Sequence, residues 1–153
     1  MSTRGLTLFV LFSLALPAGA NYDAEELKRL ITEQQSLFQI TEWNGNDQDE
    51  RWSASSAIKW LSVEINAQMT EVGSPYFSPP QRTAAQERCK AIASLALRLE
   101  TNEHMKAIEN VLTKATQHHQ NYSFELNNVR FEAIPRLNGA FVRLFCSVRP
   151  LVN

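Results

Sequence analysis

The stretch from Asp49 to Val72 constrains the fold of this chain more than any other, because it has two apolar faces when plotted at about 100° per residue. One face carries aliphatic side chains: Ala54, Ile58, Leu61, Ile65 and Val72. The opposite face carries two tryptophans and two smaller residues: Trp52, Trp60, Val63 and Ala67. Asp47 and Glu50 have the spacing of a capping box, and Gly73-Ser74-Pro75 ends the pattern. The stretch therefore predicts a central helix with neighbours on both sides.

Three further helices are predicted from apolar residues at helical spacing. The first is capped by Asp23 and runs to about Ile40. The other two span Gln81–Glu100 and Glu103–His118, and a single long, kinked helix is the alternative. Two segments between helices are predicted to be loops, one polar and one rich in proline: residues 41–49, with a turn at Asn44-Gly45, and residues 73–80.

After His119 the apolar residues alternate with polar ones, which is typical of strands. A β-hairpin is predicted over residues 122–133 with a turn at Asn127-Asn128, and a second turn at Asn138-Gly139. Residues 140–148 fit a third strand or a short helix. The predicted fold class is α+β, with about four N-terminal helices packed on a small two- or three-stranded antiparallel C-terminal sheet.

Residues 1–20 have the composition of a signal peptide. Arg4 supplies a positive charge, residues 6–16 form a short apolar run, and Pro17-Ala18-Gly19-Ala20 fits a cleavage site. An uncleaved anchor is the alternative, but the run is shorter than the roughly 20 apolar residues of a spanning helix. We therefore expect cleavage before Asn21, a single globular domain over residues 21–153 and no membrane span after cleavage.

The two cysteines, Cys89 and Cys146, both follow the predicted cleavage site. An exported chain meets an oxidising compartment, so a disulfide between them is predicted, together with a secreted or periplasmic localisation. The glycosylation sequence Asn121-Tyr122-Ser123 matters only in a eukaryotic source. The leader does not distinguish a bacterial periplasm from eukaryotic secretion.

The charge of the chain is nearly balanced, at −1 overall, and does not indicate a nucleic-acid partner or an anionic membrane. The charges are unevenly distributed. Residues 21–52 contain eight acids and three bases, whereas residues 121–153 contain four arginines and two glutamates. One end of the sequence is therefore acidic and the other mildly basic.

No catalytic or ligand-binding motif of high specificity occurs in the sequence. On one helix, His104 and His118 would lie about 21 Å apart, too far to share a metal ion. The acidic segment around Asp47 lacks the glycine and the closing glutamate of a calcium-binding loop. There is no nucleophile elbow and no phosphate-binding loop. We therefore predict no metal and no cofactor, and we assign no catalytic residue.

Surface recognition has better support, because large aromatic side chains are enriched in binding hot spots. The candidate binding residues are aromatic or acidic: Trp43, Asp47, Asp49, Trp52, Trp60, Tyr76 and Phe77. Burial in the core is the alternative for the aromatic ones. The functional hypothesis is an exported, non-enzymatic protein-binding module, such as an inhibitor, an immunity-type factor or an accessory subunit of an envelope assembly, with a basic protein as partner. The alternative is a small secreted hydrolase or lyase whose site is assembled from residues distant in sequence.

Overall fold

The computed structural model describes residues 22–138 and 141–151. The predicted signal peptide, its cleavage site and Gly139 of the predicted second turn lie outside the described residues. The first half of the chain forms two short helices and four strands: α1 Ala24–Glu33, α2 Gln35–Phe38, β1 Ile40–Asn46, β2 Arg51–Ser56, β3 Ser62–Asn66 and β4 Met69–Pro75. The second half forms two long helices and three strands: α3 Pro79–Leu97, α4 Asn102–His118, β5 Tyr122–Leu126, β6 Val129–Asn138 and β7 Phe141–Pro150.

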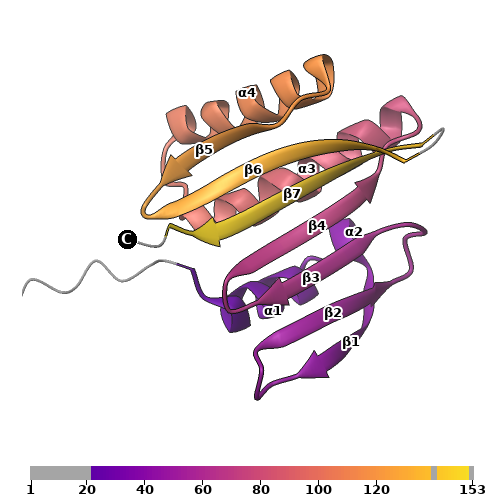
Figure 1. Cartoon of the computed structure of the whole chain (residues 1–153), viewed down its shortest axis with the longest axis vertical. Helices are drawn as coiled ribbons and strands as arrows, with labels where there is room; N and C mark the ends of the chain where they lie inside the picture. The colour runs from indigo at the N-terminus through magenta and orange to yellow at the C-terminus, as the bar shows by residue number, and fades with distance from the viewer. Residues whose placement is uncertain (1–21, 139–140, 152–153) are drawn as a thin grey trace, which may run out of the picture.

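The strands form one seven-stranded antiparallel sheet in the order β1-β2-β3-β4-β7-β6-β5. The helices of the described residues lie behind this sheet in Figure 1, with α1 against β3 and β4, α3 against β4, β7 and β6, and α4 against β6 and β5. The prediction of about four N-terminal helices on a two- or three-stranded C-terminal sheet is therefore wrong. Four of the seven strands come from the N-terminal half.

The predicted central helix is wrong, because residues 51–75 form β2, β3 and β4. The apolar residues of these strands alternate with polar ones and point toward the helices; Val63 faces Val72 across the β3–β4 ladder, and Glu64 faces Glu71 on the other side. The Asn66 side chain accepts hydrogen bonds from the backbone N–H groups of two following residues and closes the β3–β4 turn. The connections at residues 57–61 and 67–68 thus divide into three strands a stretch whose apolar spacing resembles that of one helix.

The predicted polar loop 41–49 is also mostly strand, since β1 runs from Ile40 to Asn46 and the turn follows at residues 47–50. Gly45 lies within β1 opposite Trp52 and does not form the predicted turn. A Cβ atom at Gly45 would lie 2.1 Å from the carbonyl oxygen of Arg51. Glycine is therefore required at this position by the close approach of the neighbouring strand.

Several predicted elements are confirmed. The Asp23 carboxylate accepts a hydrogen bond from the Glu26 N–H at the start of α1, although this helix ends at Glu33. The segments predicted as two helices are α3 and α4, and Thr101 caps the second. The β5–β6 hairpin turns at Asn127 and Asn128, both with positive φ, as a two-residue hairpin turn requires. The last element is the strand β7, so the helical alternative is wrong.

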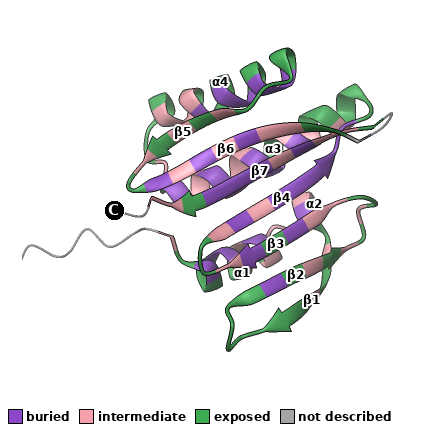
Figure 2. Ribbon diagram, viewed as in Figure 1, coloured by how far each residue is buried: buried purple, intermediate pink, exposed green. Residues whose placement is uncertain are grey.

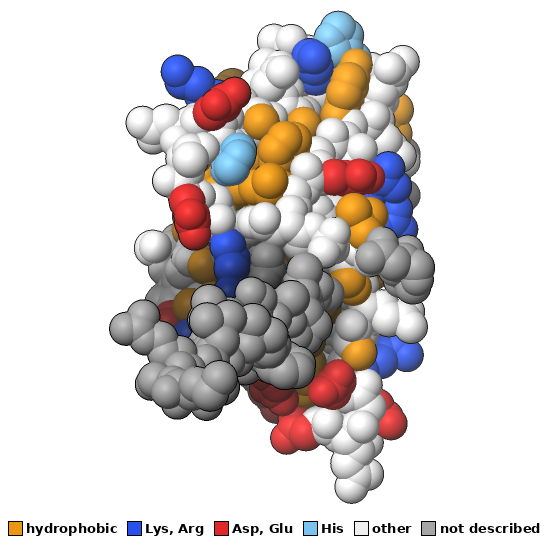
Figure 3. Space-filling model, turned by 90° about the vertical axis from the view of Figure 1, so that its left-hand side faces the viewer, with side chains coloured by type: hydrophobic (Ala, Val, Ile, Leu, Met, Phe, Trp, Pro, Cys, Tyr) orange, Lys and Arg blue, Asp and Glu red, His pale blue; other side chains and the backbone are white. Residues whose placement is uncertain are grey.

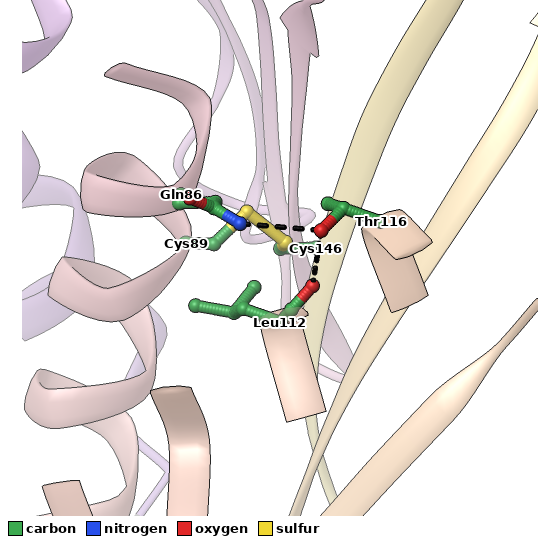
Figure 4. Close-up of a disulfide and its surroundings, with 5 residues drawn as sticks. All are labelled: Gln86, Cys89, Leu112, Thr116 and Cys146. Atoms are coloured by element: carbon green, nitrogen blue, oxygen red, sulfur yellow. Dashed lines mark hydrogen bonds between the residues drawn. A yellow bond between two sulfur atoms is a disulfide. The ribbon is translucent and has the colours of Figure 1, made fainter. Parts of the chain in front are cut away.

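The core lies between the sheet and the helices, where buried residues line the facing surfaces (Figure 2). The predicted disulfide is confirmed: Cys89 of α3 is bonded to Cys146 of β7, with Cα atoms 5.5 Å apart, and both residues are fully buried. The bond lies beside a polar link between the long helices, in which Gln86 donates to Thr116 and Thr116 donates to the Leu112 carbonyl (Figure 4). The disulfide therefore fixes the sheet to the helical layer.

The face of the sheet turned away from the helices is largely polar. Its charged residues form ion pairs, each between two strands of the sheet: Arg130 with Glu125, Arg149 with Glu132, and Arg136 with Glu71. An antiparallel sheet with one polar face is stable in contact with water. Among the described residues, no helix is long and apolar enough to cross a membrane.

Candidate functional site

Trp52, a predicted binding residue, belongs to the core and is 3% exposed. Its indole N–H donates to the Asp47 carboxylate over 2.8 Å, and the Lys28 ammonium lies 4.3 Å from the ring centroid. The hydrogen bond from Trp52, assisted by the positive charge of Lys28, holds the pKa of Asp47 below its ordinary value. Asp47 is therefore engaged by the protein itself, with its carboxylate bound to Trp52 and Lys28.

Three other predicted residues also have structural partners. Trp43 is half-buried, and its indole N–H donates to the Thr32 hydroxyl of α1 over 2.9 Å. Tyr76 is buried, and its hydroxyl donates to the Thr116 carbonyl. Asp49 is exposed at the β1–β2 turn, where its carboxylate accepts from Asn46. The structure thus places Asp47, Asp49 and Trp52 at the β1–β2 turn and Trp43 in the middle of β1, and it does not bring Trp60 or Phe77 to them.

Trp60 and Phe77 meet elsewhere, beside Phe141, at the end of the sheet formed by the β2–β3 connection, the β4–α3 connection and the start of β7 (right-hand side of Figure 1). Their exposed fractions are 58% for Trp60, 55% for Phe141 and 44% for Phe77. The rings of Phe77 and Phe141 pack edge to face with centroids 5.0 Å apart. Together with Lys59 and Arg143 they line a predominantly apolar cavity of about 330 Å³. We call these five residues the aromatic end.

Arg143 fixes the aromatic end to the sheet. One nitrogen of its guanidinium donates to the Trp60 carbonyl and the Ser62 hydroxyl, both over 2.9 Å, and to the Gly73 carbonyl over 3.2 Å. These bonds join the β2–β3 connection to β4 and β7. Trp60 has a φ of +69°, a backbone conformation that is unfavourable for a bulky residue. Strain of this kind occurs preferentially at functional positions, where the surrounding structure enforces it.

The positive charges around the cavity are only partly neutralised. Among the described residues, no carboxylate oxygen lies within 4.0 Å of a side-chain nitrogen of Lys59, Arg82 or Arg143. The Lys59 ammonium lies 5.2 Å from the Trp60 ring centroid, and the Arg82 guanidinium lies 5.0 Å from that of Tyr76, the neighbour of Phe77. The aromatic end therefore combines exposed apolar surface with two positive side chains that no described carboxylate contacts within 4.0 Å. Glu71 is nevertheless near Arg143: burial raises the pKa of Glu71, and nearby positive charge, including that of Arg143, partly opposes this rise.

A larger depression of about 490 Å³ lies on β1, β2 and β3, but its character differs. Its lining side chains are mostly polar: Asn44, Asn46, Asp49, Arg51, Ser53, Glu64 and Asn66. These residues belong to the water-exposed face of an antiparallel sheet, where polar side chains are expected without any ligand. Its volume alone therefore does not make it the better candidate.

The histidines do not form a catalytic arrangement within the described residues. No histidine nitrogen there lies within 4.0 Å of a carboxylate oxygen. His104 lies against Phe124, and His118 lies against Tyr122, with ring centroids 6.5 and 6.1 Å apart. These two histidines extend the contact between α4 and β5.

The sequence prediction omitted Lys59, Phe141 and Arg143 from the candidate site. Phe141 is 81 positions from Trp60 in the chain, and the two meet only because β7 pairs with β4. Phe141 also begins a strand of alternating residues, Phe141, Arg143, Phe145, on the water-exposed face. Apolar residues on that face were the available signal, but using it required knowing which face the helices cover.

Comparison with known proteins adds no assignment. No family model, no curated protein and no solved structure matches this chain. A function is therefore inferred from the side chains of the chain itself, and the aromatic end is the surface that supports an inference best.

Proposed function

We propose that this chain is an exported, non-enzymatic module that binds another protein through the aromatic end. The observation that carries this proposal is the exposure of Trp60, Phe77 and Phe141 at one place. Exposed apolar side chains that are contiguous, and not scattered, mark interaction surfaces in soluble proteins. Aromatic residues beside an arginine are also the usual composition of binding hot spots.

A macromolecular partner fits this surface better than a small ligand does. The three rings that line the cavity are also 44–58% exposed, so their apolar surface is not confined to the cavity. A ligand filling the cavity would leave much of this area in water, whereas a protein surface could cover it. Covering it would stabilise the complex by roughly 25 cal/mol per Å² of apolar area, before the entropic cost of association.

The hypothesis of a basic partner concerns the opposite end of β2 and stays a prediction. That hypothesis combined Asp47, Asp49 and Glu50 with the three tryptophans. The three acidic side chains are exposed at the β1–β2 turn, and Glu25 and Glu26 are exposed in the first turn of α1. Acidic side chains gather in the lower part of the face seen in Figure 3. Trp52 lies beneath this group and is too buried to contact a partner, so a basic partner would find charge there with little exposed aromatic surface.

Export is supported by the disulfide and by the leader sequence. A disulfide-bonded cysteine pair and the lack of a membrane-spanning helix among the described residues are compatible with an extracellular or periplasmic location. Mass spectrometry of protein recovered from its native compartment should find Asn21 as the first residue. An intact species that begins with Met1 would contradict cleavage.

Protein binding is tested by comparing matched baits in the native envelope or secreted fraction. The baits are the mature chain, Trp60→Ala, Phe141→Ala and the control Trp43→Ala, which removes a half-buried tryptophan of β1 that does not line the cavity. A partner of the aromatic end is retained by the mature chain and by Trp43→Ala and lost by both other variants. Equal retention by all four baits would show that this surface does not bind the partner.

A further inference from the structure

We infer that the aromatic end recognises a protein segment in which a large apolar side chain is flanked by carboxylates. This inference rests on the proposed function and adds the chemistry of the partner. It differs from the sequence-based hypothesis, which placed a basic partner on the acidic turn.

The first step of the inference is the shape of the site. The rings of Trp60, Phe77 and Phe141 surround a concave space of about 330 Å³, enough for one or two side chains of a partner. Arg143 holds the Trp60 backbone in place through its bond to the Trp60 carbonyl. A cavity fixed in this way binds an apolar side chain without the entropic cost of ordering its walls.

The second step is the charge around the cavity. Lys59 and Arg143 line it, and Arg82 in the first turn of α3 lies with its guanidinium 5.0 Å from the ring centroid of Tyr76, which precedes Phe77 in the chain. The first turn of α3 contains no acidic residue, so the positive end of the helix dipole adds to these charges. A partner carboxylate near the rim would meet several positive groups and no described carboxylate within 4.0 Å of Lys59, Arg82 or Arg143. A partner lysine would be repelled by the same groups.

An anionic membrane is the other occupant with this chemistry, since aromatic and basic residues also anchor proteins at lipid interfaces. The geometry favours a protein segment. Phe77 and Phe141 pack against each other, and all three rings face a shared hollow, whereas insertion into a lipid surface needs side chains that project outward. The acidic side chains elsewhere would also be repelled by an anionic surface.

The test uses three capped peptides that differ only in charge: acetyl-Glu-Phe-Glu-amide, acetyl-Gln-Phe-Gln-amide and acetyl-Lys-Phe-Lys-amide. The indole N–H signal of Trp60, assigned with the Trp60→Phe variant, is followed by NMR during titration of the mature, disulfide-bonded chain. The acidic peptide should bind about fivefold more tightly than the neutral one, and the basic peptide more weakly than both. Raising the salt concentration should reduce these differences.

Charge reversal provides the matched control. Lys59→Glu should remove the preference for the acidic peptide, whereas Lys114→Glu, an exposed position on α4, should leave it unchanged. Equal binding of the acidic and basic peptides at Trp60 would overturn the inferred preference for carboxylates, but it would not contradict the proposed function. No response of Trp60 to any of the peptides would overturn the inference, and the bait comparison would then decide the proposed function separately. Sedimentation of the chain with phosphatidylglycerol vesicles, lost in Trp60→Ala, would identify a membrane as the partner and overturn the inference.

Discussion

The three tryptophans of this protein occupy different environments, each defined by what surrounds the indole. Trp52 is buried and bonded to Asp47, Trp43 is half-buried and bonded to Thr32, and Trp60 is exposed on a strained connection. Large aromatic residues therefore have three separate roles within 18 positions of the sequence. The sequence alone ranks them equally, because residue type does not reveal burial.

Truncating Trp52 should destabilise the protein much more than truncating Trp60. Trp52→Ala should lower the free energy of unfolding by about 3–5 kcal/mol, because it empties a core position and leaves Asp47 without its donor. Trp60→Ala should change it by less than about 1 kcal/mol. Urea denaturation of the two variants measures both values. A comparable loss in both would show that Trp60 is part of the core.

Tyr22 should make the stability of the protein depend on pH in the alkaline range. Burial raises the pKa of Tyr22 from 10.0 to about 12, outweighing the Thr70 hydrogen bond, which lowers it. The protonated hydroxyl lies 2.7 Å from the Asn66 carbonyl, to which it donates. Because the pKa is higher in the folded state, the stabilisation is complete below pH 10 and is lost as the pH rises toward 12.

The comparison for this effect is Tyr22→Phe. The variant should be less stable near neutral pH, because it lacks the bonds to Asn66 and Thr70, and its stability should fall less between pH 10 and 12. Denaturant unfolding at several pH values measures the difference. Parallel curves for the two proteins over that range would show that Tyr22 ionises normally in the folded state.

At the scale of elements, prediction succeeded where one period extended over a whole element and where caps marked its ends. The helix α4, capped by Thr101, and the β5–β6 hairpin, in which Tyr122, Phe124 and Leu126 alternate without interruption, met this condition. The helix α3 was also predicted, although no side chain caps its N-terminus. Prediction failed over β2–β4 because the apolar residues of these three successive strands also fit a spacing of about 100° per residue. Thr70 and Ser74, which are buried, also replace apolar residues on the inner face and hide the alternation.

The candidate site was predictable only in part for a related reason. Trp60 and Phe77 were named from their residue type, and the disulfide from the compartment. The grouping of Trp60 with Phe141 depends on the pairing of β4 with β7, which local patterns cannot specify. The sequence also does not show that Trp52 and Trp60 lie far apart. Trp52 is near the start of β2 and Trp60 follows its end, so the distance between them is known only once this segment is recognised as a strand.

The disulfide joins two elements and should contribute strongly to stability. Cys89 and Cys146 are 57 positions apart, and closing a loop of that length in the unfolded chain stabilises the folded state by about 4 kcal/mol in the chain-entropy model. The double variant Cys89→Ala/Cys146→Ala should lose an amount of this order. Denaturation of the oxidised wild type and the variant under identical conditions checks it. A loss below about 1 kcal/mol would mean that the unfolded chain is already compact here.

At the scale of the whole molecule, the chain has two ends of opposite character. Acidic residues gather around the β1–β2 turn and α1 (Figure 3), whereas Lys59 and Arg143 belong to the aromatic end. The uneven charge noted in the sequence is only partly reflected in this arrangement, because Arg130 and Arg149 pair with Glu125 and Glu132 at the other end of β6 and β7.

The order of the strands has a consequence for folding rate. Within the sheet of the described residues, β4–β7 is the one ladder whose strands are not neighbours in the chain, and it joins two meanders that are otherwise formed by local hairpins. Residues 76–140 separate β4 from β7 in the chain, so forming this ladder closes a long loop. The entropic cost of closing such a loop slows folding. Cys146 faces Val72 across this ladder, so the disulfide ties α3 to β7 beside the ladder itself.

A chain that unfolds with the bond intact therefore keeps the two meanders near each other. Its refolding from urea should be faster than that of Cys89→Ala/Cys146→Ala, by up to about a thousandfold if the ladder is complete in the transition state. Stopped-flow refolding of both proteins measures the ratio, and equal rates would place the formation of this ladder after the rate-limiting step. If the disulfide-bonded chain refolds faster, the bond that stabilises the native state also speeds each return of the unfolded molecule to that state.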